Sequence, residues 1–223
     1  MSDEHLLEHV EDKVATITLN RPDALNAVTR DMLKDLYDKV EKFAEDPDVG
    51  AIVLKGAGRA FCSGGDVKSM AAGKDANATL ETRAQTLRSR MEVSRLLHEV
   101  SKPTIAMVRG PAAGAGMSLA LACDIRVASE TGKIITAFAK VGLSGDFGGS
   151  WFLTQLVGPA KARELYFLAD AVGAEEALSL CLFNRVVPDD QLEAEAMALA
   201  SRLAHGPTVT LGYMKKNLKL LNF

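Results

Sequence analysis

The chain has 223 residues, 48% of them hydrophobic, which is enough for one large domain with a substantial core. Its formal net charge of −3 gives no reason to expect a nucleic acid partner, and no apolar run is long enough to cross a bilayer. The acidic N-terminus is not a secretory signal, and Cys62, Cys123 and Cys181 lack a CxxC spacing. These features predict a cytoplasmic protein with free thiols. Because the histidines lack metal-binding spacing, no metal site is expected.

The first half of the chain predicts strands that alternate with helices. Residues 14–19 alternate between apolar and polar side chains, as a half-buried strand does. Thr29 is a candidate N-cap for a helix whose apolar residues recur at a helical spacing up to Phe43. A short apolar run at residues 51–54 is typical of a buried strand, and residues 80–97 carry the apolar stripe of a long helix. The order strand–helix–strand favours α/β packing.

The second half continues with short strands and a larger share of helix. The last expected helix carries a basic cluster, Lys215, Lys216 and Lys219, which we predict to be a solvated face. The expected strands are 104–108, 125–128 and 133–136, with an extended piece at 185–188, and the expected helices are 115–122, 151–157, 160–168, 174–180, 191–204 and 210–221.

Three turns rich in small residues, at 56–68, 110–116 and 142–149, each lead into a helical segment. A strand that passes through glycine and alanine into a helix leaves backbone N–H groups free at the helix start. The helix dipole adds partial positive charge there, and no large side chain keeps a ligand oxygen away. The structural alternative is a tight turn that uses glycine only for close packing.

The second of these turns carries no nucleotide-binding motif. Gly114 and Gly116 open like a dinucleotide-binding turn, but Leu119 stands where the third glycine belongs, and no Gly-Lys-Ser/Thr follows. Two of the turns suggest another use. If the backbone N–H groups of Gly65 and Ala115 converge, they form a two-donor oxyanion hole for a carbonyl oxygen that becomes negative during reaction.

A series of short motifs then follows the same order and spacing as in a known family. They are Asn20–Asn26, Ala60–Asp66, Lys102–Pro103, Gly110, Ala113–Gly116 and Ala122–Asp124. Over nearly its whole length the chain resembles the enoyl-CoA hydratase/isomerase (crotonase) superfamily. The resemblance implies an α/β fold, a spiral of repeated ββα units over residues 1–190, with a small helical C-terminal part at 191–223. It also implies a homotrimer or a dimer of trimers, and relatives that continue for several more helical turns.

The resemblance also implies a substrate and the residues that bind it. The substrate is an acyl-CoA thioester, with CoA entering as part of it and no permanently bound cofactor. Gly65 and Ala115 match the two oxyanion-hole positions, and Lys68 could meet a CoA phosphate, although a free surface lysine is as good an explanation. The substrate-binding residues expected in this way are Ala24, Leu25, Ser63, Gly64, Asp66, Val67, Lys68, Gly114, Ser118 and Phe138.

The chain departs from the hydratases of this family at the catalytic positions. Those enzymes use two glutamates, and the matching positions here are Ser118 and Phe138, neither of which can act as a general base. Asp146 matches the acidic residue of the isomerase and dehalogenase branches. Burial would raise the pKa of Asp146 and a helix start would lower it, which the sequence leaves open. Asp146 could also be a plain helix N-cap.

These residues predict an enoyl-CoA isomerase that shifts a double bond through a dienolate, with Asp146 as proton carrier. The main alternative is an enoyl-CoA hydratase, a lyase, without the usual glutamates. Further alternatives are Asp146 as a nucleophile on an aryl-CoA, acyl-CoA hydrolysis, and a non-catalytic acyl-CoA binder. The sequence does not distinguish an aliphatic from an aromatic acyl group.

Overall fold

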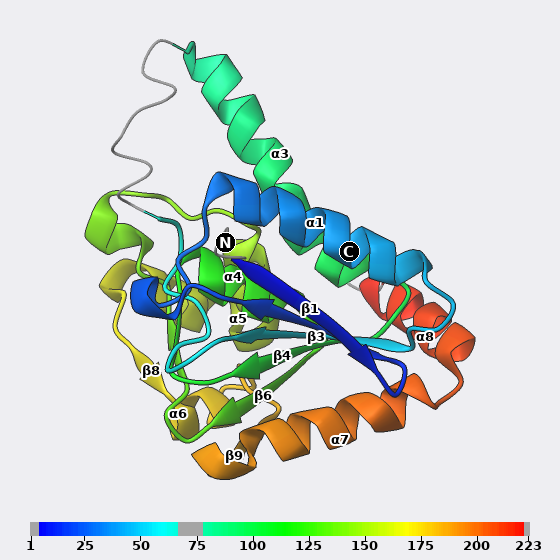
Figure 1. Ribbon diagram of the computed structural model, residues 1–223. Helices are drawn as coiled ribbons and strands as arrows, with labels where there is room; N and C mark the ends of the chain where they lie inside the picture. Colours follow the sequence, from blue (N-terminus) through cyan, green and yellow to red (C-terminus); the bar gives the residue numbers. More distant parts are fainter. Residues whose placement is uncertain (1–4, 67–77, 221–223) are drawn as a thin grey trace.

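A computed structural model describes residues 5–66 and 78–220 (Figure 1). Its larger sheet has six strands in the order β1-β2-β3-β4-β6-β9, with β1 antiparallel to β2 and every other neighbouring pair parallel. Parallel strands of this kind need helical crossovers, which is what the alternating pattern predicted. The strands are β1 (Leu6–Glu11), β2 (Val14–Leu19), β3 (Ala51–Gly56), β4 (Thr104–Val108), β6 (Ile125–Ser129) and β9 (Arg185–Val187).

A smaller sheet holds the turns that follow the main strands. It contains β5 (Pro111–Ala113), β7 (Lys133–Ile135) and β8 (Val172–Gly173), with β5 parallel to β7. A parallel bridge joins Cys62 to Ala112, and another joins Val28 to Gly65. The chain therefore runs repeatedly from the large sheet into a second, short extended segment and then into a helix, which is the expected ββα spiral.

The helices agree closely with the sequence pattern. Thr29 caps α1, and its side chain accepts a hydrogen bond from the backbone N–H of Met32 at 3.3 Å. The two helices expected at 151–157 and 160–168 form α5, which is interrupted at Gly158 (φ 76°, ψ 164°) before Pro159. The helices are η1 (Pro22–Ala24), α1 (Arg30–Glu45), α3 (Leu80–Glu99), α4 (Ala115–Ala122), η2 (Phe138–Val141), α5 (Gly149–Leu168), α6 (Ala174–Ser179), η3 (Asp189–Gln191), α7 (Leu192–Ala204) and α8 (Thr208–Leu220).

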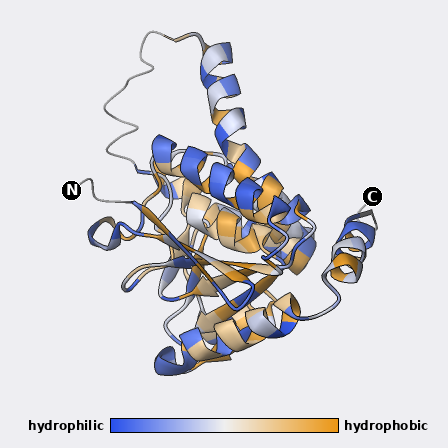
Figure 2. Ribbon diagram, turned by 45° about the vertical axis from the view of Figure 1, so that its right-hand side comes forward, coloured by the Kyte–Doolittle hydropathy of each residue, from blue (hydrophilic) through white to orange (hydrophobic). Residues whose placement is uncertain are grey.

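The apolar core lies on both faces of the larger sheet. Helix α7 packs its apolar residues on one face, against side chains that include Val14 and Val53, while α1, α3 and α4 lie on the other (Figure 1). Hydrophobic residues are concentrated in the sheet and on the helix faces turned toward it, and the outer turns are hydrophilic (Figure 2). All eight residues of α4 are buried, so this helix is the centre of the molecule. Both faces of the sheet are therefore covered, as parallel sheets require.

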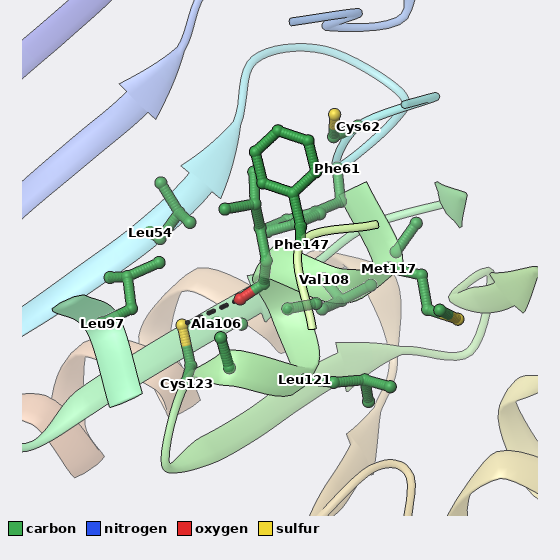
Figure 3. Packing of buried hydrophobic residues seen from close by; sticks show 14 of the residues in the cluster. Leu54, Phe61, Cys62, Leu97, Ala106, Val108, Met117, Leu121, Cys123 and Phe147 are labelled. Carbon is green, nitrogen blue, oxygen red and sulfur yellow. Dashed lines mark hydrogen bonds between the residues drawn. The ribbon is translucent and has the colours of Figure 1, made fainter. Parts of the chain in front are cut away.

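Phe147 anchors the third glycine-rich turn to this core. Its side chain is buried in the same cluster as Phe61, Val108 and Met117 (Figure 3). Phe147 adopts a positive φ of 51°, a conformation that side-chain-bearing residues rarely adopt. The ring thus fixes the turn that carries its neighbour Asp146.

Gly116 lets α4 approach the segment around Cys62 closely. An added Cβ would lie 2.6 Å from Cβ and 2.8 Å from Sγ of Cys62, which is itself fully buried. Gly116→Ala should therefore lower the free energy of unfolding by about 2–3 kcal/mol, although alanine favours helix. Urea denaturation measures the difference. Gly173→Ala, where an added Cβ meets nothing within 4 Å, is the control and should cost less than about 1 kcal/mol, the usual effect of alanine at a helix N-cap. If Gly116→Ala were as stable as the unaltered protein, α4 would be able to move freely away from Cys62.

The prediction that the basic cluster on the last helix is a solvated face is wrong for Lys215. Its side chain is only 10% exposed, and Nζ donates to Oδ2 of Asp124 at 2.7 Å and to the carbonyl of Leu97 at 3.1 Å. The reason is the helical period: Gly212, three residues earlier, packs closely on Ser101 and points the same face inward. Lys215 therefore ties α8 to the core.

Removal of this lysine should loosen α8. Lys215→Met should lower the free energy of unfolding by about 2–3 kcal/mol, because the partly buried carboxylate of Asp124 loses its cation. Thermal or urea unfolding measures the change. Lys216→Met, at an exposed position of the same helix, is the matched control and should have an effect below about 0.5 kcal/mol. A loss as large in the control would mean that the paired amine is not what holds the helix.

Candidate active site

The three glycine-rich turns meet at a cavity of about 100 Å³. It lies where β3 and β5 end and where η2 and the turn before α5 cross them, so residues far apart in sequence become neighbours. Its lining residues are Ser63, Gly64, Gly65, Gly114, Ala115, Ala137, Phe138, Val141, Leu143 and Asp146. The cavity thus brings together most of the residues that the sequence suggested for catalysis and substrate binding.

Two backbone donors at this cavity are unused. Neighbouring N–H groups are paired: that of Asp66 donates to the carbonyl of Val28 at 3.0 Å, and that of Gly114 to the carbonyl of Ile135 at 2.9 Å. In the part of the chain that the structure describes, the N–H groups of Gly65 and Ala115 have no acceptor. Both residues line the cavity, so two backbone donors without an acceptor belong to its wall.

The two turns that carry these donors are in contact. Gly64 has a φ of 105°, and a Cβ added to it would lie 3.0 Å from the carbonyl oxygen of Ala113 and 3.7 Å from the nitrogen of Ala115. A side chain here would fill the space beside the donor at Ala115, and it would be strained by the positive φ as well. Glycine at this position keeps the turns close and the approach to the donor open.

Asp146 is the only titratable side chain among the described residues that line the cavity. Burial raises its pKa from 3.8 to about 6, which answers the question that the sequence left open. Its Oδ1 is buried and has no hydrogen-bond partner in the described residues. It does not cap α5, because the N-cap residue is Gly148 and no side chain caps the helix. The carboxyl group is therefore left free of a structural role at that helix.

Ser118 does not line the cavity, although the resemblance suggested that it contacts substrate. It is fully buried, and its Oγ lies 3.2 Å from the carbonyl oxygen of Gly114 and 3.1 Å from that of Asp146. The same carbonyl of Asp146 accepts from the N–H of Gly149 at 3.0 Å. Ser118 therefore connects the turn that carries one free donor to the turn that carries the carboxyl group.

The expected CoA-side residues lie next to one another beside Ser63. The N–H of Ser63 donates to the carbonyl of Leu25 at 2.9 Å, and its Oγ donates to the carbonyl of Ala24 at 3.3 Å. Asp66 forms an ion pair with Arg21 at 2.9 Å, so its charge is already neutralised. These contacts fix η1 against the first turn. Val67 and Lys68 lie outside the described residues.

One residue near the cavity carried no signal in the sequence. Tyr166 belongs to α5, and its ring stacks on Phe138 with centroids 5.9 Å apart and an interplanar angle of 9°. Its hydroxyl is buried without a hydrogen-bond partner in the described residues. Burial, with Asp146 nearby, raises the pKa of this phenol well above its ordinary value. Tyr166 is therefore a second polar group behind the cavity wall.

Other kinds of site find no support in the described ranges 5–66 and 78–220. No helix there has both the length and the apolar character to span a membrane. No three His, Cys, Asp or Glu side chains there are grouped so that they could hold a metal ion. The three cysteines are free thiols, with Cys62 and Cys123 buried and Cys181 exposed.

The spiral of ββα units, with a cavity where its turns meet, places the molecule in the crotonase-fold class. A protein of Thermobifida fusca YX, solved in complex with CoA, superposes with a TM-score of 0.89 at 36% identity, over 97% of this chain and 85% of its own. The family model described as enoyl-CoA hydratase/isomerase matches residues 9–220. The chain belongs to the enoyl-CoA hydratase/isomerase family, which confirms the resemblance and the predicted fold.

Named relatives in this family catalyse different reactions. The 1,2-epoxyphenylacetyl-CoA isomerase of Escherichia coli K12 is 38% identical over 96% of this chain and 81% of its own. The short-chain-enoyl-CoA hydratase of Clostridium acetobutylicum ATCC 824 is 36% identical over 92% of this chain and 77% of its own. The family therefore defines an acyl-CoA enzyme, and both isomerases and hydratases occur among its similar members.

Proposed function

We propose that this protein is an enoyl-CoA isomerase, which moves a carbon–carbon double bond along the acyl chain of a CoA thioester. Asp146 is the proton carrier, and the N–H groups of Gly65 and Ala115 bind the thioester oxygen. Family membership supplies the acyl-CoA substrate class. The proposal narrows that class to one reaction.

The observation that carries the proposal is the single carboxyl group in the cavity. Of the described lining residues, only Asp146 can take up and release a proton near neutral pH. Addition of water in this family relies on two glutamates, and Ser118 and Phe138 stand at the matching positions. One carboxyl group suits a reaction in which a proton leaves one carbon and returns to another.

The reaction then needs one proton movement in each direction. The carboxylate of Asp146 removes a proton from C2 of a 3-enoyl-CoA, and the electron pair moves into the thioester carbonyl to form a dienolate. The two backbone donors stabilise the negative oxygen as it forms. The carboxylic acid of Asp146 then returns the proton to C4, and the double bond lies between C2 and C3. Phe138, Val141 and Leu143 surround the acyl chain with apolar surface.

The pKa of Asp146 suits both halves of this cycle. Burial raises it to about 6, because the cavity disfavours the charged form. At about pH 7.5 the group is then mostly ionised and able to act as the base, while its conjugate acid is still able to return the proton. An ordinary aspartate, with a pKa near 3.8, would be a weaker base for a C–H bond.

A substrate panel tests the proposal. Purified protein is offered 2-enoyl- and 3-enoyl-CoA thioesters of matched chain length, and the products are separated by chromatography. Interconversion of the two series, lost in Asp146→Asn, is the expected result. Rapid addition of water to crotonyl-CoA, undiminished in Asp146→Asn, overturns the proposal in favour of a hydratase. Binding of the thioesters without any turnover favours a non-catalytic binder.

Two further substrates separate other roles of Asp146. The epoxide of phenylacetyl-CoA is included because of the Escherichia coli relative. Exclusive turnover of this epoxide would replace double-bond isomerisation by epoxide isomerisation. Halide release from a halogenated aryl-CoA would make Asp146 a nucleophile and would overturn its role as a proton carrier.

A further inference from the structure

Tyr166 and Asp146 share an unusual condition. In the described residues, Oη of Tyr166 and Oδ1 of Asp146 are the two buried side-chain polar atoms that lack a hydrogen-bond partner. One is a hydroxyl donor and the other is a carboxyl acceptor, so each offers what the other lacks. Buried polar groups in folded proteins are normally paired, and unpaired ones call for a functional explanation.

The hydroxyl of Tyr166 lies against the turn that carries Asp146. A Cβ added to Gly145 would lie 3.3 Å from Oη, and one added to Gly149 would lie 3.0 Å from it. Gly145 directly precedes Asp146 and Gly149 follows it by three residues, so a larger residue at either position would push the hydroxyl away. The stack on Phe138 holds the ring in this position. The phenol is thus held against the turn that carries Asp146.

No other titratable group competes for this position in the described residues. The remaining cavity-lining residues carry no charge. Lys140 on η2 and Arg163 and Glu164 on α5 are exposed, and Lys161 pairs with Glu164 at 2.8 Å. Helix α4 contributes no titratable side chain. Among the described residues, the titratable side chain that lies against the turn of Asp146 is therefore Tyr166.

We propose that Tyr166 is a positioning residue for Asp146: its hydroxyl donates to Oδ1 of the ionised carboxyl group and directs Oδ2 toward the cavity. Since both atoms lack a partner in the described residues, this contact requires the carboxyl group to rotate toward the hydroxyl. The hydrogen bond favours the charged form and holds the basic oxygen in line with the substrate carbon. This inference rests on the proposed function, since it assigns Asp146 the role of base.

Tyr166→Phe tests the inference, because phenylalanine keeps the stack on Phe138 and removes only the hydroxyl. We expect kcat for isomerisation to fall about tenfold with KM within about twofold, since the base loses alignment but binding does not. The acidic limb of the kcat/KM profile should move up by about one pH unit, because the carboxylate loses a donor. Tyr37→Phe is the matched control. Tyr37 also has a partly buried ring, but its hydroxyl contacts Glu41 at 3.3 Å on α1, so both readouts should stay unchanged.

A measurement without substrate keeps this inference separate from the proposed function. The carboxyl carbon of Asp146 is titrated by NMR, with Asp146→Asn identifying its resonance. A higher pKa in Tyr166→Phe than in the unaltered protein supports the contact, even if the isomerase assay fails. An unchanged titration together with an unchanged pH profile overturns the inference, while loss of activity in Asp146→Asn would leave the proposed function standing.

Discussion

Asp146→Asn is expected to lower kcat/KM for 3-enoyl-CoA isomerisation by about 10³-fold, with binding of the thioester changed by no more than about twofold. The amide keeps the size of the side chain but neither takes nor returns a proton. Steady-state kinetics and calorimetric titration with a non-reacting acyl-CoA measure the two quantities. Asp170→Asn, at an exposed position after α5, is the control and should leave both unchanged. Full activity in Asp146→Asn would remove this carboxyl group from the reaction.

The same variant should gain stability at neutral pH. The pKa of Asp146 rises from 3.8 to about 6 on folding, so the folded protein holds this proton more tightly than the unfolded chain. Stability is therefore complete below about pH 4, falls as the pH rises to about 6, and stays lower above it. Asp146→Asn should be more stable by about 2 kcal/mol at about pH 7.5 and equal to the unaltered protein near pH 4. A shift of two pKa units corresponds to roughly 3 kcal/mol. The expected gain is smaller than this because the carboxyl group is partly solvated.

Ala115→Pro is expected to lower kcat/KM by about 10²–10³-fold, because it removes one of the two backbone donors. Proline has no N–H, and its ring occupies the space in front of the missing donor. Ala115 is the first residue of α4, where proline is compatible with the helix. Gly114 before it has a φ of 51° and a ψ of −121°, an extended conformation of mirror-image hand that glycine keeps readily. Chain folding should therefore survive, and circular dichroism and kinetics together check the result.

Ala174→Pro provides the control for this experiment. Ala174 is the first residue of α6, and Gly173 before it has an extended backbone with φ −72° and ψ 171°, which suits a following proline. Neither residue lines the cavity. The control should keep full activity. If Ala115→Pro is equally active, the N–H of Ala115 does not bind the thioester oxygen.

The helices and most of the strands could be predicted from the sequence, because they depend on local patterns, whereas the meeting of the glycine-rich turns was implied only by the family resemblance. Apolar periodicity marks α1 and β2, and a run of small residues between a strand and a helix marks each turn. Strand β1 was missed. It is an edge strand with five of its six residues exposed, and its hairpin turns through Asp12 and Lys13, both at positive φ. A two-residue hairpin turn of this kind usually has the sequence Asn-Gly, which is absent here.

The polar details of the site could not be predicted, because they arise from packing between distant segments. Lys215 and Tyr166 lie on helices whose apolar pattern predicts only approximately which side chains turn toward the core. Only the docked position of α8 buries the amine, and only the turn before α5 encloses the hydroxyl. Ser118 is similar, since its two carbonyl partners come from turns that the sequence cannot place side by side. The apolar pattern of the sequence predicts helices and strands, whereas hydrogen-bond partners depend on how these helices and strands are placed relative to one another.

The position of Ser118 bears on how the site could diverge from its relatives. The side chain is fully buried, and its Oγ leaves no space for any substituent on Gly149. A glutamate at 118 would need the first turn of α5 to retreat, and the retreat would displace Asp146 at the same time. In this chain a longer side chain at position 118 therefore competes for space with the turn that carries Asp146. An exchange of Ser118 for glutamate would therefore have to be accompanied by a change in the backbone of that turn.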